Sequence, residues 1–228
     1  QDKLRDFFNS ISFPSTLVDP DDTSLTPDFS LSLMSLPYAL RNHHRMPLHQ
    51  SSFMKRPDKQ LSSLNTLPKN ENKPLIGLCW RGNPSNRNDV NRSLSLERLL
   101  LLAKMNVTLV NLQIDLTEEE DALLKTNDIT NPCHGLSTFS GTAAICEQLD
   151  AVVTVDTSIC HLAGSLEIPT FLLLSKASDW RWGTAISKTP WYNKMKLFKQ
   201  VTLGDWDEPL EALMREVGND VITKRGLI

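Results

Sequence analysis

The sequence has few residues that could build a disulfide framework. Its 228 residues include four scattered cysteines, with no CxxC pair: Cys79, Cys133, Cys146 and Cys160. A chain of this length can bury a sufficient core without disulfides, so we expect reduced thiols. Cys79 and Cys146 lie in apolar segments and are expected to be buried.

Long apolar runs and basic clusters are missing as well. No run approaches the ~20 apolar residues that span a bilayer, and no signal peptide is recognisable. We therefore expect a cytoplasmic protein, either free or peripheral at the inner membrane face. The formal net charge of -3 and the lack of a basic run argue against nucleic-acid binding. The chain begins with Gln1, which fits a piece of a longer protein.

The first 72 residues are poor in glycine and rich in loop-forming residues. Residues 2–8 have the pattern of a short helix, and residues 29–36 alternate like a half-buried strand. Residues 41–72 are polar and favour a solvated linker. The alternative interpretation of this segment is a metal site made by His43, His44 and His49. These histidines lack carboxylate or cysteine neighbours at ligand spacing.

From residue 73 onward, apolar runs of strand length alternate with helical patterns. We expect strands at 74–80, 107–112 and 196–199, a short one at 129–133, and helices at 94–104, 117–124, 141–149 and 207–217. Residues 150–174 read as strand, polar turn, helix, tight turn and strand. This alternation predicts an α/β fold, a Rossmann-like parallel sheet flanked by helices, whose ligands sit at the carboxyl ends of the strands.

The turn within 150–174 is the strongest candidate for an anion-binding site. Asp156, Thr157 and Ser158 follow a strand and offer helix N-caps, so the next backbone N–H groups would point out of the sheet edge. The following helix has an apolar stripe that leaves His161 off the core side. Asp156 could bond substrate hydroxyls, act in catalysis, or only cap the helix.

Other predicted loops end at the same edge. Residues 81–93 carry Arg81, Asn83 and Arg92, whose donors suit phosphate oxygens, although an ordinary exposed loop is the alternative. Gln113 follows the second strand, where a polar group can reach a ribose or form part of a turn. In residues 136–142 the hydroxyls favour helix capping over ligand contact.

Tryptophans cluster after the last strand of this unit. Trp180, Trp182 and Trp191 lie within twelve residues, which indicates a packed lid or a stacking platform for a base or sugar. The first strand is followed by no GxGxxG, which disfavours a dehydrogenase.

Several of these features together resemble the carboxyl-terminal half of the family 9 glycosyltransferases, the heptosyltransferase-like group, especially the branch associated with tetratricopeptide repeats. The matching segments are 77–84, 91–94, Leu112-Gln113, 156–164, 179–182, 190–192 and 204–206. The resemblance covers residues 74–217 and extends faintly to 27–40.

The resemblance implies a GT-B architecture, with residues 73–228 as the domain that binds the nucleotide-sugar and residues 1–72 as a truncated remnant of the acceptor domain plus linker. It implies an inverting, metal-independent hexosyl or heptosyl transfer without a cofactor. The acceptor would be a glycan or protein, and an upstream domain or repeat array could belong to the full-length protein. The donor-binding residues it indicates are Arg81, Asn83, Arg92, Gln113, Asp156, Thr157, Ser158, His161 and Trp180.

The catalytic base is not identified by the resemblance, because the family is expected to supply it from the amino-terminal domain. Asp156 is the best candidate within this chain. The alternative hypothesis is a degenerate GT-B domain that binds a nucleotide or a partner without transfer.

Overall fold

The computed structural model describes residues 16, 18–19, 22–32, 35, 39, 67–68, 72–132, 137–183 and 187–223. These residues contain one five-stranded sheet, in which every pairing is parallel and the order is β2-β1-β3-β4-β5. The strands are β1 (Leu75–Cys79), β2 (Thr108–Asn111), β3 (Ala151–Val155), β4 (Thr170–Leu174) and β5 (Met195–Lys199). The predicted Rossmann-like α/β fold is therefore confirmed.

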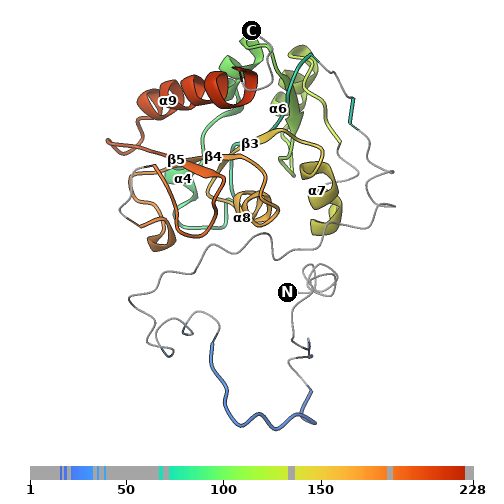
Figure 1. The fold of residues 1–228 in the computed structure, drawn as a ribbon, viewed down its shortest axis with the longest axis vertical. Coiled ribbons are helices and arrows are strands. Elements are labelled where there is room, and N and C mark those ends of the chain that lie inside the picture. The colour runs from blue at the N-terminus through green and yellow to red at the C-terminus, as the bar shows by residue number, and fades with distance from the viewer. Residues whose placement is uncertain are drawn as a thin grey trace.

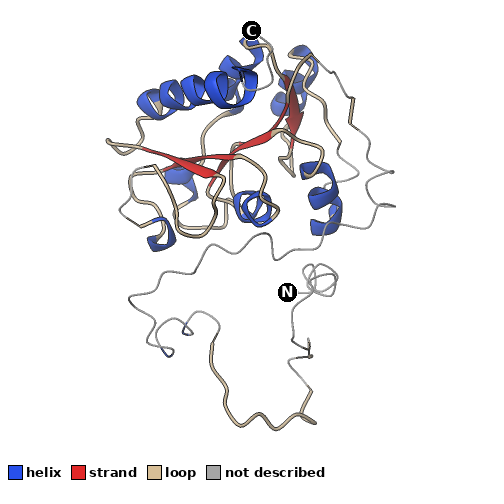
Figure 2. Ribbon diagram, in the orientation of Figure 1, coloured by secondary structure: helices blue, strands red, loops and turns tan. Residues whose placement is uncertain are grey.

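Helices cover both faces of the sheet (Figures 1 and 2). One face packs against α5 (Leu96–Leu99), the 3-10 helix η3 (Leu100–Lys104), α6 (Glu118–Thr126), α9 (Asp207–Val217) and the π-helical turn η6 (Gly218–Ile222). The other face packs against α7 (Phe139–Cys146) and α8 (Ser158–Ser165). Because both faces are covered, β1, β3 and β4 are buried at every position, which explains their continuous apolar sequences.

Packing against the sheet is tight at Gly77 in β1. A Cβ there would lie 2.6 Å from methyl groups of Leu112 and Leu149, so only glycine fits without repacking. On the opposite face, α9 places Leu210, Leu213 and Val217 at helical spacing, all 5% exposed or less. The apolar residues of α9 thus recur at the spacing of one helix face, which lets that face pack against the sheet.

Most of the expected elements from residue 73 onward are present. The predicted capping box of α6 forms, since Thr117 Oγ1 accepts from Glu120 N and Glu120 accepts from Thr117 N. Thr138 caps α7, as its sequence suggested, although this helix starts and ends before the predicted 141–149. The predicted helix 94–104 is realised as α5 followed by η3, and the Ser95 side chain makes no capping hydrogen bond.

Two strand predictions were wrong where the structure describes them. In the segment 129–133, the described residues contribute only a bridge between Val110 and Thr130, so this run adds no strand. Residues 29–32 form no strand, and Phe29 is 94% exposed, since none of the described strands pairs with them. The predicted helix 2–8, the histidines His43, His44 and His49, and Cys133 lie outside the described residues.

The segment before the sheet is represented by few described residues. Leu67 is 3% exposed and packs with the α7 and α8 side of the core, and its N–H donates to Gln148 Oε1 at 3.0 Å. The division of the chain into 1–72 and 73–228 stays a prediction.

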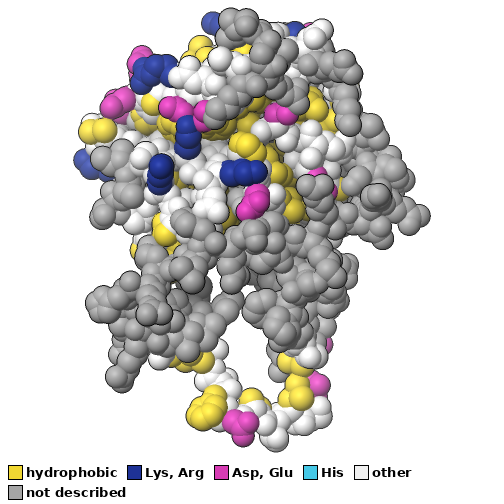
Figure 3. All heavy atoms as spheres, viewed as in Figure 1, with side chains coloured by type: hydrophobic (Ala, Val, Ile, Leu, Met, Phe, Trp, Pro, Cys, Tyr) yellow, Lys and Arg dark blue, Asp and Glu magenta, His cyan; other side chains and the backbone are white. Residues whose placement is uncertain are grey.

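The described surface carries mixed charge. On the face shown in Figure 3, Lys and Arg side chains lie interspersed with Asp and Glu side chains. Among the described residues, no helix is long and apolar enough to cross a membrane.

Candidate anion-binding site at the carboxyl edge of the sheet

The turn after β3 opens α8 in the way its sequence predicts. Of the three candidate caps, Thr157 is the one used, because its Oγ1 accepts from Ile159 N at 3.3 Å. Asp156 is half-buried and Ser158 is exposed. We call Asp156, Thr157 and Ser158 the Asp156 turn. The first N–H groups of α8 and the partial positive charge of its N-terminus favour an anion here.

Arg92 lies directly beside the Asp156 turn. Its Nη1 donates to the Asp156 carbonyl at 2.8 Å, and its Nε donates to Asp89 Oδ1 at 2.9 Å. Arg92 ends the short helix α4 (Asp89–Arg92), which interrupts a segment expected to be loop throughout. The predicted meeting of an arginine from the first loop with this turn is thus seen in the structure.

Gly82 leaves the space in which this arginine lies. A Cβ at Gly82 would overlap the Arg92 guanidinium and the Asp89 carboxylate. The Gly82 N–H donates to Ser93 Oγ at 2.9 Å, which ties the two ends of the loop together. Asn83 lies on the exposed part of this loop, where its Oδ1 accepts from Ser85 N at 2.9 Å. The Asn83 side-chain oxygen therefore stabilises a local turn.

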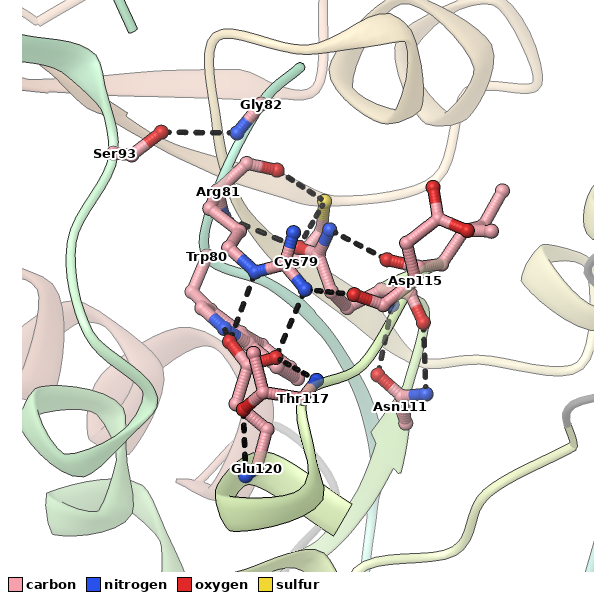
Figure 4. Close-up of polar contacts among 11 residues, drawn as sticks. Cys79, Trp80, Arg81, Gly82, Ser93, Asn111, Asp115, Thr117 and Glu120 are labelled. Atoms are coloured by element: carbon pink, nitrogen blue, oxygen red, sulfur yellow. Dashed lines mark hydrogen bonds and ion pairs between the residues drawn. The ribbon is translucent and has the colours of Figure 1, made fainter. Parts of the chain in front are cut away.

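Arg81 does not point to the Asp156 turn but into a separate cluster (Figure 4). Its Nε and Nη2 each donate to a Glu120 carboxylate oxygen at 2.9 Å, and Nη2 also donates to the Asp115 carbonyl. Trp80 Nε1 donates to the same carboxylate at 2.6 Å. We call Trp80, Arg81, Asp115, Thr117 and Glu120 the Glu120 cluster.

The electrostatics of the Glu120 cluster favour the ionised pair. Burial alone would raise the pKa of Glu120, but hydrogen bonds from Arg81, Thr117 and Trp80 outweigh it and lower the pKa to about 2. The hydrogen bond to Glu120 also raises the pKa of Arg81. The Arg81 guanidinium is thus already neutralised by a carboxylate, which makes it a weaker phosphate ligand than its sequence position suggested.

Gln113 is also used within the fold. It is 7% exposed, its Oε1 accepts from Arg81 N at 3.1 Å, and its Nε2 donates to the Ile114 carbonyl at 3.0 Å. Cys79 lies between the two parts of the edge, with its Sγ 3.6 Å from both Gln113 Oε1 and Thr157 Oγ1. Burial raises the pKa of the Cys79 thiol, which keeps it protonated.

His161 lies one turn into α8, away from the apolar stripe as expected. Its Nδ1 is 2.9 Å from the Tyr192 hydroxyl, and its ring stacks on Trp182 with centroids 5.3 Å apart. Burial lowers the pKa of His161. Tyr192 is a site residue that the sequence did not single out, although it belongs to the segment 190–192 that carries part of the resemblance.

The tryptophan loop contains both a packed and an exposed member. Trp182 is 1% exposed, whereas Trp180 in the 3-10 helix η5 (Trp180–Trp182) is 62% exposed. The Arg181 guanidinium lies 5.2 Å from the Trp180 ring centroid, and Trp191 Nε1 donates to the Arg181 carbonyl at 2.7 Å. Trp182 thus supports the fold, and Trp180 offers a free ring face at the edge.

One group of described side chains, Asp156, Cys160 and His161, consists of residue types that can bind a metal ion. Ligand atoms of Asp156, Cys160 and His161 lie within 4.8 Å of one another. Cys160 is fully buried, its thiol donates to the Thr157 carbonyl at 2.9 Å, and burial raises its pKa well above the usual range. These contacts are those of a protonated thiol, whereas a metal would need a thiolate.

A cavity of about 790 Å³ lies at the opposite end of the sheet. Asp150, Pro169 and Lys194, which precede β3, β4 and β5, are among its lining residues. Lys196 also lines it but is paired with Glu216 and Asp220. The cavity therefore does not have the position expected of the anion site, although Lys188 and Lys194 also line it.

The fold and the carboxyl-edge loops define a Rossmann-like domain with an arginine beside a helix N-terminus. The chain matches no known family model. It is 30% identical over 142 residues to Protein FlbA of Caulobacter vibrioides, a match that covers 59% of this chain and 23% of FlbA. The chain thus spans about a quarter of the length of this curated relative.

Two solved structures align with part of this chain. A glycosyl transferase family 9 protein from Veillonella parvula aligns with a TM-score of 0.43 and 11% identity, over 75% of this chain and 46% of that one. The wall teichoic acid polymerase TagF aligns with a TM-score of 0.33 and 16% identity, over 50% of this chain and 28% of that one.

Proposed function

We propose that this chain is the donor-binding part of a nucleotide-sugar glycosyltransferase, in which the Asp156 turn and Arg92 hold the donor diphosphate. The observation that carries the proposal is the 2.8 Å hydrogen bond from Arg92 Nη1 to the Asp156 carbonyl. It places a permanent positive charge beside the N-terminus of α8, whose partial positive charge also favours phosphate oxygens.

The chemistry of transfer fits this arrangement. A nucleoside diphosphate leaves as an anion, and donors that are already oriented stabilise the developing charge without reorganisation. Arg92 is suited to this role because Asp89 and the Asp156 carbonyl hold its guanidinium in place. The sequence resemblance to family 9 glycosyltransferases supports the assignment and implies an inverting, metal-independent reaction.

An inverting transfer also requires a base that activates the acceptor hydroxyl. A general base needs an available carboxylate or imidazole at the acceptor hydroxyl. Asp89 and Asp179 are ion-paired with Arg92 and Arg181, so neither is free for this role. Asp156 remains the best candidate in this chain. These pairings favour a second candidate function, nucleotide binding without transfer.

The proposal is tested by nucleotide binding in the presence of a chelator. A thermal-shift screen of nucleoside diphosphates and their sugars selects the ligand, and calorimetry then compares the wild type with Arg92→Ala and Asp156→Ala. Loss of charge-assisted hydrogen bonds, about 1.5–3 kcal/mol, predicts roughly 10- to 100-fold weaker binding for Arg92→Ala. Asp156→Ala should weaken binding of the nucleotide-sugar, because its carboxylate is expected to accept from sugar hydroxyls.

Arg98→Ala is the matched control. Arg98 forms an ion pair with Asp207 at 2.9 Å, and its side chain is 44% exposed. This variant removes one arginine without touching the Asp156 turn, so its affinity should equal that of the wild type. Unchanged affinity in both Arg92→Ala and Asp156→Ala would sink the proposal, and binding without sugar transfer to any acceptor would support the second candidate.

A further inference from the structure

A row of polar groups includes the imidazole of His161. The hydroxyl of the half-buried Tyr192 lies 2.9 Å from His161 Nδ1, and the Ser165 side chain acts to lower the pKa of Tyr192. Ser165 is 8% exposed and ends α8, one turn beyond His161. His161, Tyr192 and Ser165 therefore form one row of polar groups between α8 and the segment before β5, in which a hydrogen bond joins Tyr192 and His161.

The fold holds the middle member of this row closely. The Tyr192 ring lies against Gly164, where a Cβ would be 2.6 Å from the ring atom Cγ. The His161 ring stacks on Trp182, with an interplanar angle of 13°. Both the phenol and the imidazole are thus restricted in position, so their hydrogen bond is not an incidental surface contact.

The direction of the protons follows from the chemistry of the partners. A phenol O–H is a better donor than an imidazole N–H, and an imidazole nitrogen is a better acceptor than a phenol oxygen. The favoured arrangement has Tyr192 donating to His161 Nδ1. The remaining proton of a neutral imidazole must then be on Nε2.

Nε2 has no hydrogen-bond partner among the described residues, and a ring nitrogen of His161 lies within 4.8 Å of an Asp156 carboxylate oxygen. The imidazole is therefore next to the Asp156 turn. We propose that Tyr192 is a positioning residue that fixes the His161 proton on Nε2, so that His161 presents one N–H donor to the anionic ligand of the Asp156 turn. The identity of that ligand as a nucleoside diphosphate rests on the proposed function.

The titration behaviour of the two rings agrees with this arrangement. Burial lowers the pKa of His161, which favours the neutral imidazole, although the charge of Asp156 acts in the opposite direction. Burial raises the pKa of Tyr192 to about 12, so that its proton is retained for donation. Arg181 and Asp179 are the other charged groups that act on His161, and they oppose each other.

The tautomer of His161 can be measured without any ligand. Two-bond ¹H–¹⁵N spectra of the imidazoles, recorded above neutral pH with a chelator, are assigned by comparison with His161→Gln. Wild type should show a pyridine-type Nδ1 and a protonated Nε2. Tyr192→Phe should shift His161 toward a mixture of tautomers, and Trp191→Phe, which removes a donor from the same loop, should leave it unchanged.

Gly164→Ala perturbs the contact between Tyr192 and His161 through packing alone. The added methyl group would displace the Tyr192 ring, so the His161 signals should change in the direction seen for Tyr192→Phe. A protonated Nδ1 in the wild type, a metal-type shift, or identical tautomers in wild type and Tyr192→Phe would each overturn the proposal.

Calorimetry with the nucleoside diphosphate separates the positioning role of Tyr192 from the proposed function. Tyr192→Phe should bind about 2- to 10-fold more weakly, the size of one hydrogen bond. If wild type binds no nucleoside diphosphate, the proposed function fails. The spectra still show whether Tyr192 fixes the His161 proton on Nε2. If wild type binds and Tyr192→Phe binds equally well, His161 does not donate to the ligand and that part of the inference is wrong.

Discussion

The Glu120 cluster and the Asp156 turn lie at the same edge of the sheet but differ in how their polar groups are used. In the Glu120 cluster, Arg81 donates to Glu120 and to the Asp115 carbonyl, and Trp80 shares the same carboxylate. At the Asp156 turn, Arg92 is also ion-paired, but it meets Asp89 through Nε alone, and its Nη1 donates to the Asp156 carbonyl. Two arginines eleven residues apart thus each pair with a carboxylate, and Arg92 is the one that contacts the Asp156 turn.

The largest expected effect on stability is that of Arg81→Ala. It would leave Glu120, whose side chain is 14% exposed, without its main partner. Breaking a buried ion pair costs ~3–5 kcal/mol, and we expect about 2–3 kcal/mol here because Arg81 is 23% exposed. Chemical denaturation measures this, and calorimetry should show little loss of nucleotide affinity. The reverse result, weak binding with unchanged stability, would place Arg81 in the ligand site.

Acid should destabilise the protein through Glu120. Its pKa is lowered in the folded state to about 2, so its contribution to stability is present above the unfolded pKa, near 4.5, and is lost as the pH falls toward 2. Urea midpoints between pH 5 and pH 2.5 should therefore fall more steeply for wild type than for Glu120→Gln. Parallel curves would show that the Glu120 cluster does not stabilise the ionised carboxylate.

Gly82→Ala should act on the Asp156 turn while leaving every charge in place. The new methyl group would displace the ends of Arg92 and Asp89, which are flexible, so we expect a loss of at most about 1 kcal/mol in unfolding free energy. Nucleotide affinity should fall toward that of Arg92→Ala. An affinity equal to wild type would show that the position of Arg92 is not critical.

Trp180→Ala should have the smallest effect on stability. The ring is 62% exposed, and its contact with Arg181 contributes about 0.5–1 kcal/mol at most. If the ring stacks on the base or sugar, affinity should fall about fivefold or more, since stacking on an aromatic ring contributes ~1–3 kcal/mol. Unchanged affinity would show that the Trp180 ring does not contact the ligand.

The sequence predicted the layers of the fold well because burial on both faces gives continuous apolar runs. The bounds of α9 match the prediction, and β3, α8 and β4 form the expected unit. The segment 129–133 failed because strand-like residues need a neighbour along their whole length, and only Thr130 among those described finds one. An isolated strand-like run is thus harder to predict than a strand that pairs along its length, since the edge strands β2 and β5 were both predicted.

For the candidate site, the sequence predicts which loop carries each residue but not which partner its side chain contacts. The carboxyl edge follows from the strand ends, and the structure has Arg81, Gln113 and Asp156 just after the ends of β1, β2 and β3. The direction of the Arg81 guanidinium depends on Glu120, thirty-nine residues away, and that of His161 depends on Tyr192, thirty-one residues away. Such contacts are set by tertiary packing and carry no local signal.

The most direct test of the central claim is the location of the bound nucleoside diphosphate in amide and arginine side-chain NMR spectra. We predict that titration shifts the backbone signals of Ser158, Ile159 and Cys160 and the Nε–H signal of Arg92, while the Arg81 Nε–H and the Gln113 side-chain signals stay in place. Shifts at Arg81 and Gln113 without shifts at the start of α8 would contradict the account and move the diphosphate to the Glu120 cluster.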